Sequence, residues 1–184
     1  MSDPGDTKVR LFFAALPDLV TAQAIAAAAG AVNLPAEARL VPRINHHMTL
    51  AFIGEVATQD IPTLRAIGGA QRAPSFSLTF DAYEYWPKPE VIVGAARTPP
   101  TAVERLWVQL HRELASHGWA LEPKRLRPHV TLARKVSQAP VLQAMSPFEW
   151  PVREFCLMSS DTSGIQPAYT VVERWPLLDN GEKA

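Results

Sequence analysis

The sequence predicts an α+β protein built from two similarly organised halves. Short apolar runs typical of strands alternate with alanine-rich or amphipathic runs typical of helices. The order strand, helix, histidine-bearing strand, helix, strand occurs twice, and His129 follows His47 by 82 residues (129 − 47). Because there are only two copies, the pattern indicates a pseudo-twofold arrangement rather than a solenoid.

The halves are expected to form a single bilobal domain over residues 1–184. The repeat spans about residues 8–82 and 90–175. The polar tails, residues 1–7 and 179–184, are expected to be flexible because nothing in their sequence would hold them against a core.

The first half begins with an apolar, aromatic-rich strand over Val9–Leu16. Asp18 can cap the alanine-rich helix that follows. The first histidine strand is predicted over Ile44–Ile53 and bounded by Gly54. The remaining elements of this half are a helix over Asp60–Ala70 and an alternating, half-buried strand over Phe76–Phe80.

The second half repeats this order. A strand over Val91–Arg97 precedes the clearest helix, Thr98–Gly118, where apolar residues recur at three- and four-residue spacing. The second histidine strand is predicted over Arg125–Val136. The last elements are a short helix over Ala139–Met145 and two strands near Val152–Ser160 and Ala168–Trp175.

Composition excludes several classes of protein. Lys plus Arg (18) balance Asp plus Glu (18), so no global field attracts nucleic acid or a membrane surface. The lone Cys156 cannot form an internal disulfide, which fits a reducing compartment. The polar N-terminus does not resemble a signal peptide, and no apolar run reaches the roughly 18 residues of a membrane span. We therefore expect a cytoplasmic protein that does not bind a membrane, and we expect a monomer.

Two short motifs carry the chemistry: "HMTL", from His47, and "HVTL", from His129. On a strand, residues two apart share a face, so His47 and Thr49 point one way while their apolar neighbours point into the core. The same holds for His129 and Thr131. If the halves are related by a pseudo-twofold, these two faces meet across one cleft.

Two opposed histidines suit in-line displacement at phosphorus without a metal. One neutral imidazole accepts a proton from attacking water, and a protonated one donates to the leaving alkoxide. Unperturbed histidine titrates near ~6.5, so base and acid coexist near neutral pH. Hydroxyl groups of Thr49 and Thr131 would donate hydrogen bonds to the nonbridging phosphate oxygens.

Other residues are weaker candidates for substrate binding. Arg125 and Arg127 could follow an RNA backbone next to a phosphate site, although such charge runs are usually solvated strand edges. Arg134 stands at odd spacing from His129, so only strand twist or a bulge would bring it to the same face. Phe52 fits a core position, but on the cleft it would provide a stacking platform for a base.

A zinc site made of His46, His47 and His129 is a further alternative. Adjacent strand residues diverge, however, and no carboxylate or cysteine stands at ligand spacing, so we expect no metal. His46 is expected at a core edge or on the surface, outside the catalytic face. We expect His111 and His117 to be solvated or to cap the long helix locally.

The motifs resemble those of the two-histidine phosphoesterases, in particular the bacterial and archaeal RNA 2',3'-cyclic phosphodiesterases once described as 2'-5' RNA ligases. The similar segments are "RLFFAALP", "INHHMTLAFIGEV" and "RPHVTLARKV". The resemblance implies two pseudosymmetric lobes, each an antiparallel sheet with helices outside, around a central cleft. It also implies that His47 is the proton donor and His129 the acceptor, with Thr49 and Thr131 on the phosphate.

The reaction implied by the resemblance opens a 2',3'-cyclic phosphate at an RNA 3' end, or in a cyclic nucleotide, and leaves a 2'-phosphate. No cofactor is expected. Two alternatives remain open at this point. The same site could serve a 2'-5' RNA ligase or a phosphodiesterase acting on other RNA or nucleotide substrates, or the cleft could belong to a non-catalytic module that binds RNA ends.

Overall fold

Strands and a few helices alternate along the part of the chain that the structure, a computed structural model, describes: residues 7–119, 121, 125–164 and 167–179. The elements are β1 (Lys8–Ala15), α1 (Leu19–Gly30), β2 (Arg39–Leu40), η1 (Arg43–Asn45), β3 (Met48–Ala57), η2 (Thr58–Asp60), α2 (Ile61–Gly69), β4 (Phe76–Phe80), β5 (Ala82–Trp86), β6 (Val91–Ala95), α3 (Thr101–Ser116), β7 (His129–Arg134), β8 (Phe148–Val152), β9 (Glu154–Asp161) and β10 (Ala168–Pro176). The α+β class is therefore confirmed. The predicted flexible tails lie almost entirely outside the described residues.

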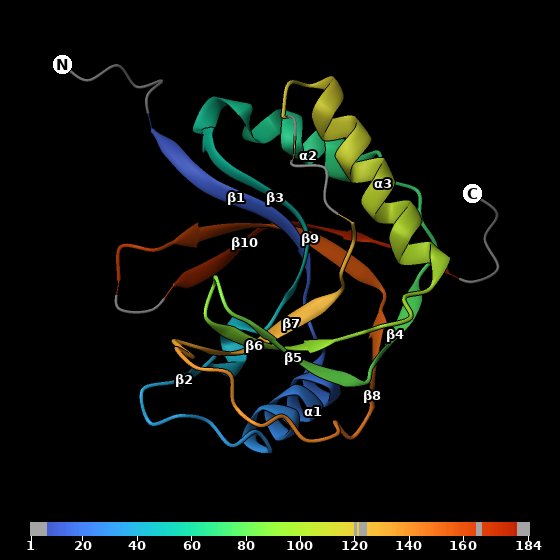
Figure 1. Ribbon diagram of the computed structural model, residues 1–184. Helices are drawn as coiled ribbons and strands as arrows, with labels where there is room; N and C mark the ends of the chain where they lie inside the picture. The colour runs from blue at the N-terminus through green and yellow to red at the C-terminus, as the bar shows by residue number, and fades with distance from the viewer. Residues whose placement is uncertain (1–6, 120, 122–124, 165–166, 180–184) are drawn as a thin grey trace.

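The strands form two four-stranded sheets, in the orders β10-β9-β1-β3 and β2-β7-β6-β5, and a separate pair, β4-β8. Neighbouring strands in each sheet run antiparallel. Each histidine strand, β3 or β7, pairs with the strand that opens its half, β1 or β6. The sheets lie one above the other between α2 and α3 on one side and α1 on the other (Figure 1).

The helices exchange sides between the two halves. α1 follows β1 in the chain but contacts β7 and β8, and α3 follows β6 but contacts β3 (Figure 1). At the start of α1, the Asp18 carboxylate accepts a hydrogen bond from the Thr21 backbone N–H at 2.7 Å, as the sequence predicts for a cap. One helix of each half therefore packs on the histidine strand of the other half, and both four-stranded sheets contain strands from the two halves.

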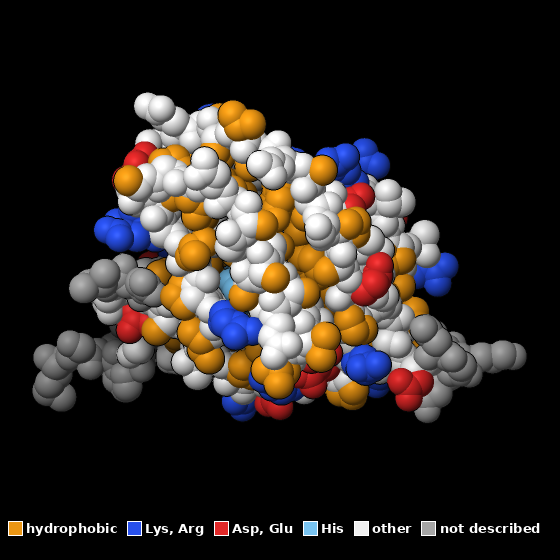
Figure 2. All heavy atoms as spheres, turned by 90° about the horizontal axis from the view of Figure 1, so that it is seen from below, with side chains coloured by type: hydrophobic (Ala, Val, Ile, Leu, Met, Phe, Trp, Pro, Cys, Tyr) orange, Lys and Arg blue, Asp and Glu red, His pale blue; other side chains and the backbone are white. Residues whose placement is uncertain are grey.

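A shared hydrophobic core results from this exchange. The buried cluster includes Phe13 of β1, Ile25 of α1, Leu110 of α3 and Trp150 of β8. Viewed from below, from the side of α1, apolar side chains are interspersed with uncharged polar and backbone atoms over the middle of the surface, and charges of both signs are scattered, most of them around its edge (Figure 2). On this face no broad basic surface is present, in keeping with the balanced net charge.

The predicted short helix over Ala139–Met145 is wrong, because this segment has no regular structure. Pro140 lies within this range and Pro147 follows it, and the few intrahelical hydrogen bonds that could form between the two prolines would not offset the cost of helix nucleation. Val141 is 89% exposed, whereas Met145 is buried and anchors the loop to the core.

The first histidine strand begins later and continues further than predicted. Ile44 lies in the 3-10 turn η1 and is 86% exposed, and the strand begins only at Met48. Gly54 does not end the strand. Its φ of +92° lies in the left-handed region, which glycine adopts at little cost, and the adjacent Ile53 is an extra residue in the pairing with β1.

Strands β5 and β8 are not predicted from the sequence. β5 pairs with β6 across a connection that includes Glu90 at a positive φ of 52°, and β8 pairs with β4. β5 alternates Tyr83 and Tyr85 with other residues, a pattern that is sufficient to indicate a strand. Within the described residues, no helix is long and apolar enough to cross a membrane.

The contact between α2 and β10 provides a test of packing. A Cβ added to Gly68 would meet the Trp175 ring at 2.5 Å. That ring cannot easily move, since it also packs on Phe13 and Phe155 at centroid distances of 5.9 and 5.4 Å. We expect Gly68→Ala to lower the free energy of unfolding by about 1–3 kcal/mol, the usual range for overpacking, as measured by urea denaturation.

Gly30→Ala, at the end of α1, is the matched control. No atom lies within 4 Å of its added Cβ, so the substitution is expected to be neutral or stabilising by up to ~1 kcal/mol. Equal effects of the two substitutions would contradict the packing described for Gly68.

Candidate active site

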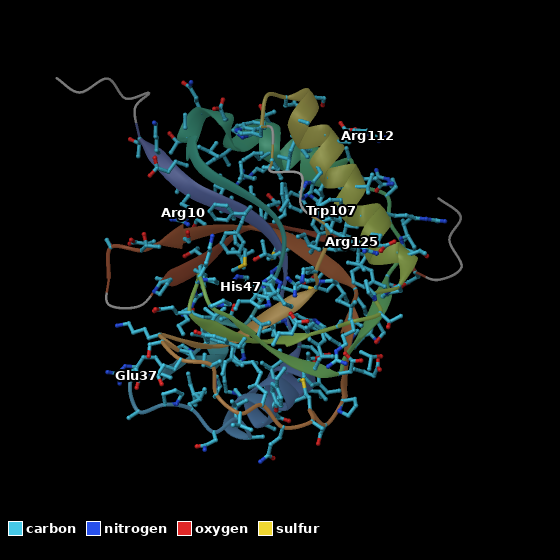
Figure 3. The ribbon with its side chains drawn as sticks, in the orientation of Figure 1. Arg10, Glu37, His47, Trp107, Arg112 and Arg125 are labelled. Carbon is cyan, nitrogen blue, oxygen red and sulfur yellow. The ribbon has the colours of Figure 1, made fainter. Side chains whose placement is uncertain are left out.

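The His47 ring is fixed at the start of β3 by one hydrogen bond and two aromatic neighbours. Its Nδ1 lies 2.8 Å from the backbone carbonyl oxygen of Asn45. Phe12 and Tyr169 contact the ring at centroid distances of 5.1 and 4.9 Å. Figure 3 shows His47 near the middle of the molecule, between the two sheets. The ring is half-buried and has one orientation defined by its surroundings.

The His129 ring is held in the same manner at the start of β7. Its Nδ1 lies 2.7 Å from the backbone carbonyl oxygen of Arg127, again two residues earlier in the chain. Trp86 contacts this ring at a centroid distance of 4.5 Å. The repeat therefore includes the hydrogen bond that orients each imidazole, as well as the histidine itself.

These hydrogen bonds define the tautomer of both rings. A carbonyl oxygen only accepts, so Nδ1 carries the proton and Nε2 is the nitrogen that remains to exchange a proton with a substrate. The carbonyl-held Nδ1–H is the arrangement expected of an imidazole that acts through Nε2 as a base, or as an acid once it is protonated.

Burial favours the neutral form of both histidines. The pKa of His47 is lowered to about 4, chiefly by burial; the Asn45 carbonyl opposes this shift, and the charges of Arg134 and His129 add to it. Burial also lowers the pKa of His129, against the opposing effects of the Arg127 carbonyl and the Glu84 carboxylate. At neutral pH both rings are therefore largely uncharged.

Each histidine strand contains one extra residue directly after its threonine. In β3, Ala14 pairs with Thr49 but Phe13 pairs with Ala51, so Leu50 has no partner. In β7, Val93 pairs with Thr131 but Ile92 pairs with Ala133, so the extra residue is Leu132. These are β-bulges at equivalent positions, 82 residues apart.

The bulges change which side chains face the site. Leu50 and Ala51 are both buried, as are Leu132 and Ala133, so the alternation shifts by one residue after each threonine. Arg134 consequently returns to the face of Thr131, and Phe52 returns to the face of Thr49. Strand twist or a bulge is expected to be necessary to bring Arg134 to the face of Thr131, and β7 contains such a bulge. Phe52 is the counterpart of Arg134 in β3.

The carbonyl oxygens of the two bulged residues both have partners outside their own strand pair. Nε2 of His111, on α3, lies 3.3 Å from the Leu50 oxygen, and the Val41 N–H donates to the Leu132 oxygen at 2.9 Å. His111 is half-buried and also packs on Trp107 at 4.1 Å. The expectation that His111 is solvated or caps its own helix is therefore wrong. His117 does cap locally, with Nδ1 2.9 Å from the Glu113 oxygen.

A cavity of about 260 Å³ opens beside His47; we call it the His47 cavity. Its lining includes Arg10, His47, Thr49, Phe52, Arg134 and Tyr169. Phe52 is 47% exposed, and the Arg10 guanidinium lies over its ring at 4.8 Å. The first motif, the bulge-shifted Phe52 and an arginine of the second motif thus meet around one space. The cavity combines hydroxyl, cationic and aromatic groups.

A second cavity, of about 370 Å³, lies beside His129; we call it the His129 cavity. Arg125 and Arg127, the two arginines that the sequence suggests for an RNA backbone, line it. Arg127 is already engaged, because its Nη2 lies 2.5 Å from Glu84 Oε2 and its guanidinium covers the Trp86 ring at 4.8 Å. Contact of Arg125 or Arg127 with a substrate stays a prediction.

His46 does not face the site. Its side chain is in the core, 2% exposed, and neither ring nitrogen has a hydrogen-bond partner among the described residues. Burial lowers the pKa of His46, so the ring is neutral at physiological pH. Among the described residues, no group of three His, Cys, Asp or Glu side chains is placed to hold a metal ion. The expected absence of a metal requirement stays a prediction.

Several site residues were not predicted from the sequence. Tyr169 comes from β10, Arg10 from β1, and Trp86 with Glu84 from β5, all far in sequence from the motif that they contact. Of these features, only the bulges could be recognised in the sequence. Both motifs continue with Leu-Ala, two successive apolar residues where strict alternation would place one apolar and one polar residue. The two imidazoles are held alike but line separate cavities, His47 with Thr49 and Arg134 and His129 with Arg125 and Arg127, and Thr131 is in the lining of neither. An imidazole with arginines beside it suits proton transfer at an anionic centre.

Comparison with known proteins identifies the family of the chain. The family model for the 2'-5' RNA ligase superfamily matches residues 17–164, and the chain belongs to this superfamily. The RNA 2',3'-cyclic phosphodiesterase of Escherichia coli (strain K12) is 35% identical over 181 residues, covering 96% of this chain and 99% of that protein. The protein of the same name from Thermus thermophilus is 31% identical, covering 92% and 90%.

A solved structure of E. coli LigT with 3'-AMP has a TM-score of 0.85 to this chain at 30% identity, covering 93% of this chain and 99% of that one. A structure described only as a phosphoesterase has a TM-score of 0.86 at 31% identity, covering 94% and 99%. The resemblance seen in the motifs is thereby confirmed for the fold and the family.

The contact between α3 and the β3 bulge can be tested by substitution. His111→Ala leaves the Leu50 carbonyl without its side-chain donor, so we expect the free energy of unfolding to fall by about 1–3 kcal/mol, the usual cost of an unsatisfied buried group. Urea denaturation measures this change.

His111→Gln retains an N–H donor and is expected to recover part of the loss. The control is His117→Ala on the same helix, where the side chain is exposed; we expect a change within about 0.5 kcal/mol. If His111→Ala were as mild as His117→Ala, the proposed support of the bulge would be wrong.

Proposed function

We propose that the protein hydrolyses RNA ends that bear a 2',3'-cyclic phosphate, leaving a 2'-phosphomonoester, by general acid–base catalysis with two histidines. The observation that carries the proposal is the matched pair of imidazoles, each with Nδ1 on the carbonyl of the residue two positions earlier. The relatives described above carry the name of this activity. The proposal includes action as a monomer without a metal.

In this mechanism His129 acts as the base. Its neutral Nε2 accepts a proton from water as the water oxygen attacks phosphorus, and the lowered pKa keeps the ring in the neutral form that this step requires. The Arg127 carbonyl stabilises the imidazolium that forms, because it accepts the Nδ1–H hydrogen bond.

His47 acts as the acid and protonates the 3' oxygen as its bond to phosphorus breaks, which leaves the phosphate on the 2' oxygen. The assignment of donor and acceptor comes from the family resemblance. With a pKa of about 4, His47 needs the negative charge of the bound phosphate to raise its affinity for a proton. Substrate binding and proton uptake at His47 are therefore coupled.

The two threonines and Arg134 act on the phosphate. Thr49 lines the His47 cavity, and Thr131 follows His129 by two residues on β7, so each hydroxyl shares a strand face with an imidazole and donates to the nonbridging oxygens. Arg134 lines the His47 cavity and adds a cation that stabilises the charge developing on those oxygens. Phe52 and Tyr169 provide aromatic surface for the nucleoside.

The direct test is to incubate the protein with adenosine 2',3'-cyclic phosphate and with an oligonucleotide ending in a cyclic phosphate. The expected product of both is the 2'-phosphomonoester, identified by chromatography against 2'- and 3'-phosphate standards. We expect His47→Ala and His129→Ala each to lower kcat by about 10²–10⁴-fold, the usual contribution of a general acid or base, with folding intact by circular dichroism.

His117→Ala is the control, since this exposed ring lies at the end of α3, away from both cavities. Full activity in either catalytic variant would contradict the mechanism, and loss of activity on treatment with a chelator would contradict metal independence. Formation of 2'-5' linked oligonucleotides would instead identify ligation, and binding of the cyclic end without turnover would identify a non-catalytic module.

The lowered pKa values also predict the pH dependence of the rate. In the free enzyme, the acid His47 loses its proton as pH rises through about 4, and the base His129 gains one as pH falls through a value below 6.5. The profile of kcat/KM, which reports the free enzyme, is therefore bell-shaped with both limbs in the acidic range.

Bound phosphate raises the pKa of His47, so the alkaline limb of kcat must lie at higher pH than that of kcat/KM. Full pH profiles of both parameters with adenosine 2',3'-cyclic phosphate measure this separation. If the alkaline limbs of the kcat and kcat/KM profiles coincide, bound phosphate does not raise the pKa of His47.

A further inference from the structure

A third cavity continues from the His47 cavity past Arg134. It has a volume of about 320 Å³, and we call it the Arg39 cavity. Arg134, Pro167 and Tyr169 line both spaces. The Tyr169 ring, which contacts the His47 imidazole edge-on at 4.9 Å, therefore stands at the boundary between them. A chain-like ligand in the His47 cavity could extend into the Arg39 cavity.

The Arg39 cavity attracts anions. Three cationic side chains line it, Arg39, Arg134 and Lys135, and no carboxylate does so among the described residues. Arg39 and Arg134 are direct partners across β2 and β7, an arrangement of like charges that is unfavourable without an anion. The ion pairs formed among the described residues include none of the three. The nearby Glu37 carboxylate accepts a hydrogen bond from Ser137 at 2.6 Å.

The backbone supports a role for Lys135. Its φ of 58° is in the left-handed region, which is uncommon for a residue other than glycine and costs of order 1–3 kcal/mol. The Val136 N–H donates to the Glu90 oxygen at 2.9 Å and so fixes this turn at the end of β7. The strained turn is where Lys135 joins the lining of the cavity.

The lining of the cavity also includes apolar and aromatic side chains. These are Leu40, which is 51% exposed, Val41, Pro42 and Tyr169. A space lined by cations together with aromatic and aliphatic groups fits a nucleotide, because the phosphate can meet the cations while the sugar and base pack on the apolar groups.

The direction of the RNA chain follows from the proposed function, on which this inference rests. His47 protonates the 3' oxygen, so the terminal nucleoside lies on the side of His47. Its 5' phosphodiester then leads away from the reacting phosphate. We infer that the Arg39 cavity binds the penultimate nucleotide of the RNA, with Arg39 and Lys135 on the phosphodiester that joins it to the terminal one.

The His129 cavity fits this role less well. Glu84 and Glu104 both line it, and the Arg127 guanidinium is occupied by Glu84. Carboxylates in the wall repel a phosphodiester. The attacking water approaches from the His129 side, opposite the leaving oxygen, so the nucleoside chain does not need this space.

The test compares two substrates that differ by one nucleotide: adenosine 2',3'-cyclic phosphate and the dinucleotide ApA with a terminal 2',3'-cyclic phosphate. We expect a higher kcat/KM for the dinucleotide. Arg39→Gln and Lys135→Asn should each lower kcat/KM for the dinucleotide about five- to tenfold, as expected for loss of a charged hydrogen bond, and leave the mononucleotide within twofold. Asparagine tolerates the left-handed conformation, so Lys135→Asn removes the charge without adding strain.

The salt dependence gives a second readout. Removal of one phosphate contact should lower the slope of log affinity against log salt by about 0.7 for the single-stranded ligand. This slope is measured by the binding of a fluorescent ApA that ends in a 2'-phosphate, which needs no turnover. Arg112→Gln is the control, since this exposed arginine lies on α3, well away from His47 in Figure 3.

The outcomes separate this inference from the proposed function. If the wild-type protein hydrolyses the mononucleotide but does not favour the dinucleotide, or if the variants affect both substrates equally, the subsite is wrong and the function stands. If neither substrate is hydrolysed, the function fails, and the binding measurement still decides whether Arg39 and Lys135 hold the second nucleotide. An unchanged Kd and salt slope in both variants would overturn the subsite.

Discussion

One extra residue in each histidine strand determines which side chains form the site. Without the bulges at Leu50 and Leu132, strict alternation would direct Phe52 and Arg134 toward the core, where an arginine would have no partner. A bulge also leaves a carbonyl outside the strand pairing. The structure supplies a partner for each carbonyl, from α3 in one case and from the segment after β2 in the other. These two elements lie outside the histidine strands, yet they help to hold the bulges that shape the site.

The exchange of helices between the halves likewise makes each histidine strand depend on residues far from it in the sequence. β3, which follows His47, packs under α3 of the second half, and β7, which begins at His129, packs on α1 of the first half. Each histidine strand is thus backed by a helix from the other half. The proposed in-line displacement requires an acid and a base on opposite sides of phosphorus, so in that mechanism the relative placement of the two rings matters more than either ring alone. The exchanged helices fix that placement through one shared core.

The sequence predicts the class of fold and the two motifs because both depend on local periodicity. A histidine and a threonine two residues apart share a strand face wherever the strand lies. Tyr169 and Arg10 could not be predicted, since their positions depend on how β10 and β1 pair with distant strands. His46 and His111 show the same limit: one ring is in the core and the other supports a bulge, although neither role has a sequence signature. The Leu-Ala step after each threonine was the one local signal for the bulges.

Because the two histidines are buried, their protonation is expected to depend on whether a phosphate is bound nearby. Burial lowers the pKa of His47 to about 4, so at pH 7 the ring is almost entirely neutral and, in the proposed mechanism, lacks the proton it must donate until phosphate binds. A bound phosphate changes this balance, since an anion near His47 favours the imidazolium and offsets the repulsion from Arg134. His129 lies beside Glu84, whose charge limits the lowering of its pKa. In the proposed mechanism, the bound phosphate therefore helps to set the protonation state of the ring that acts on it.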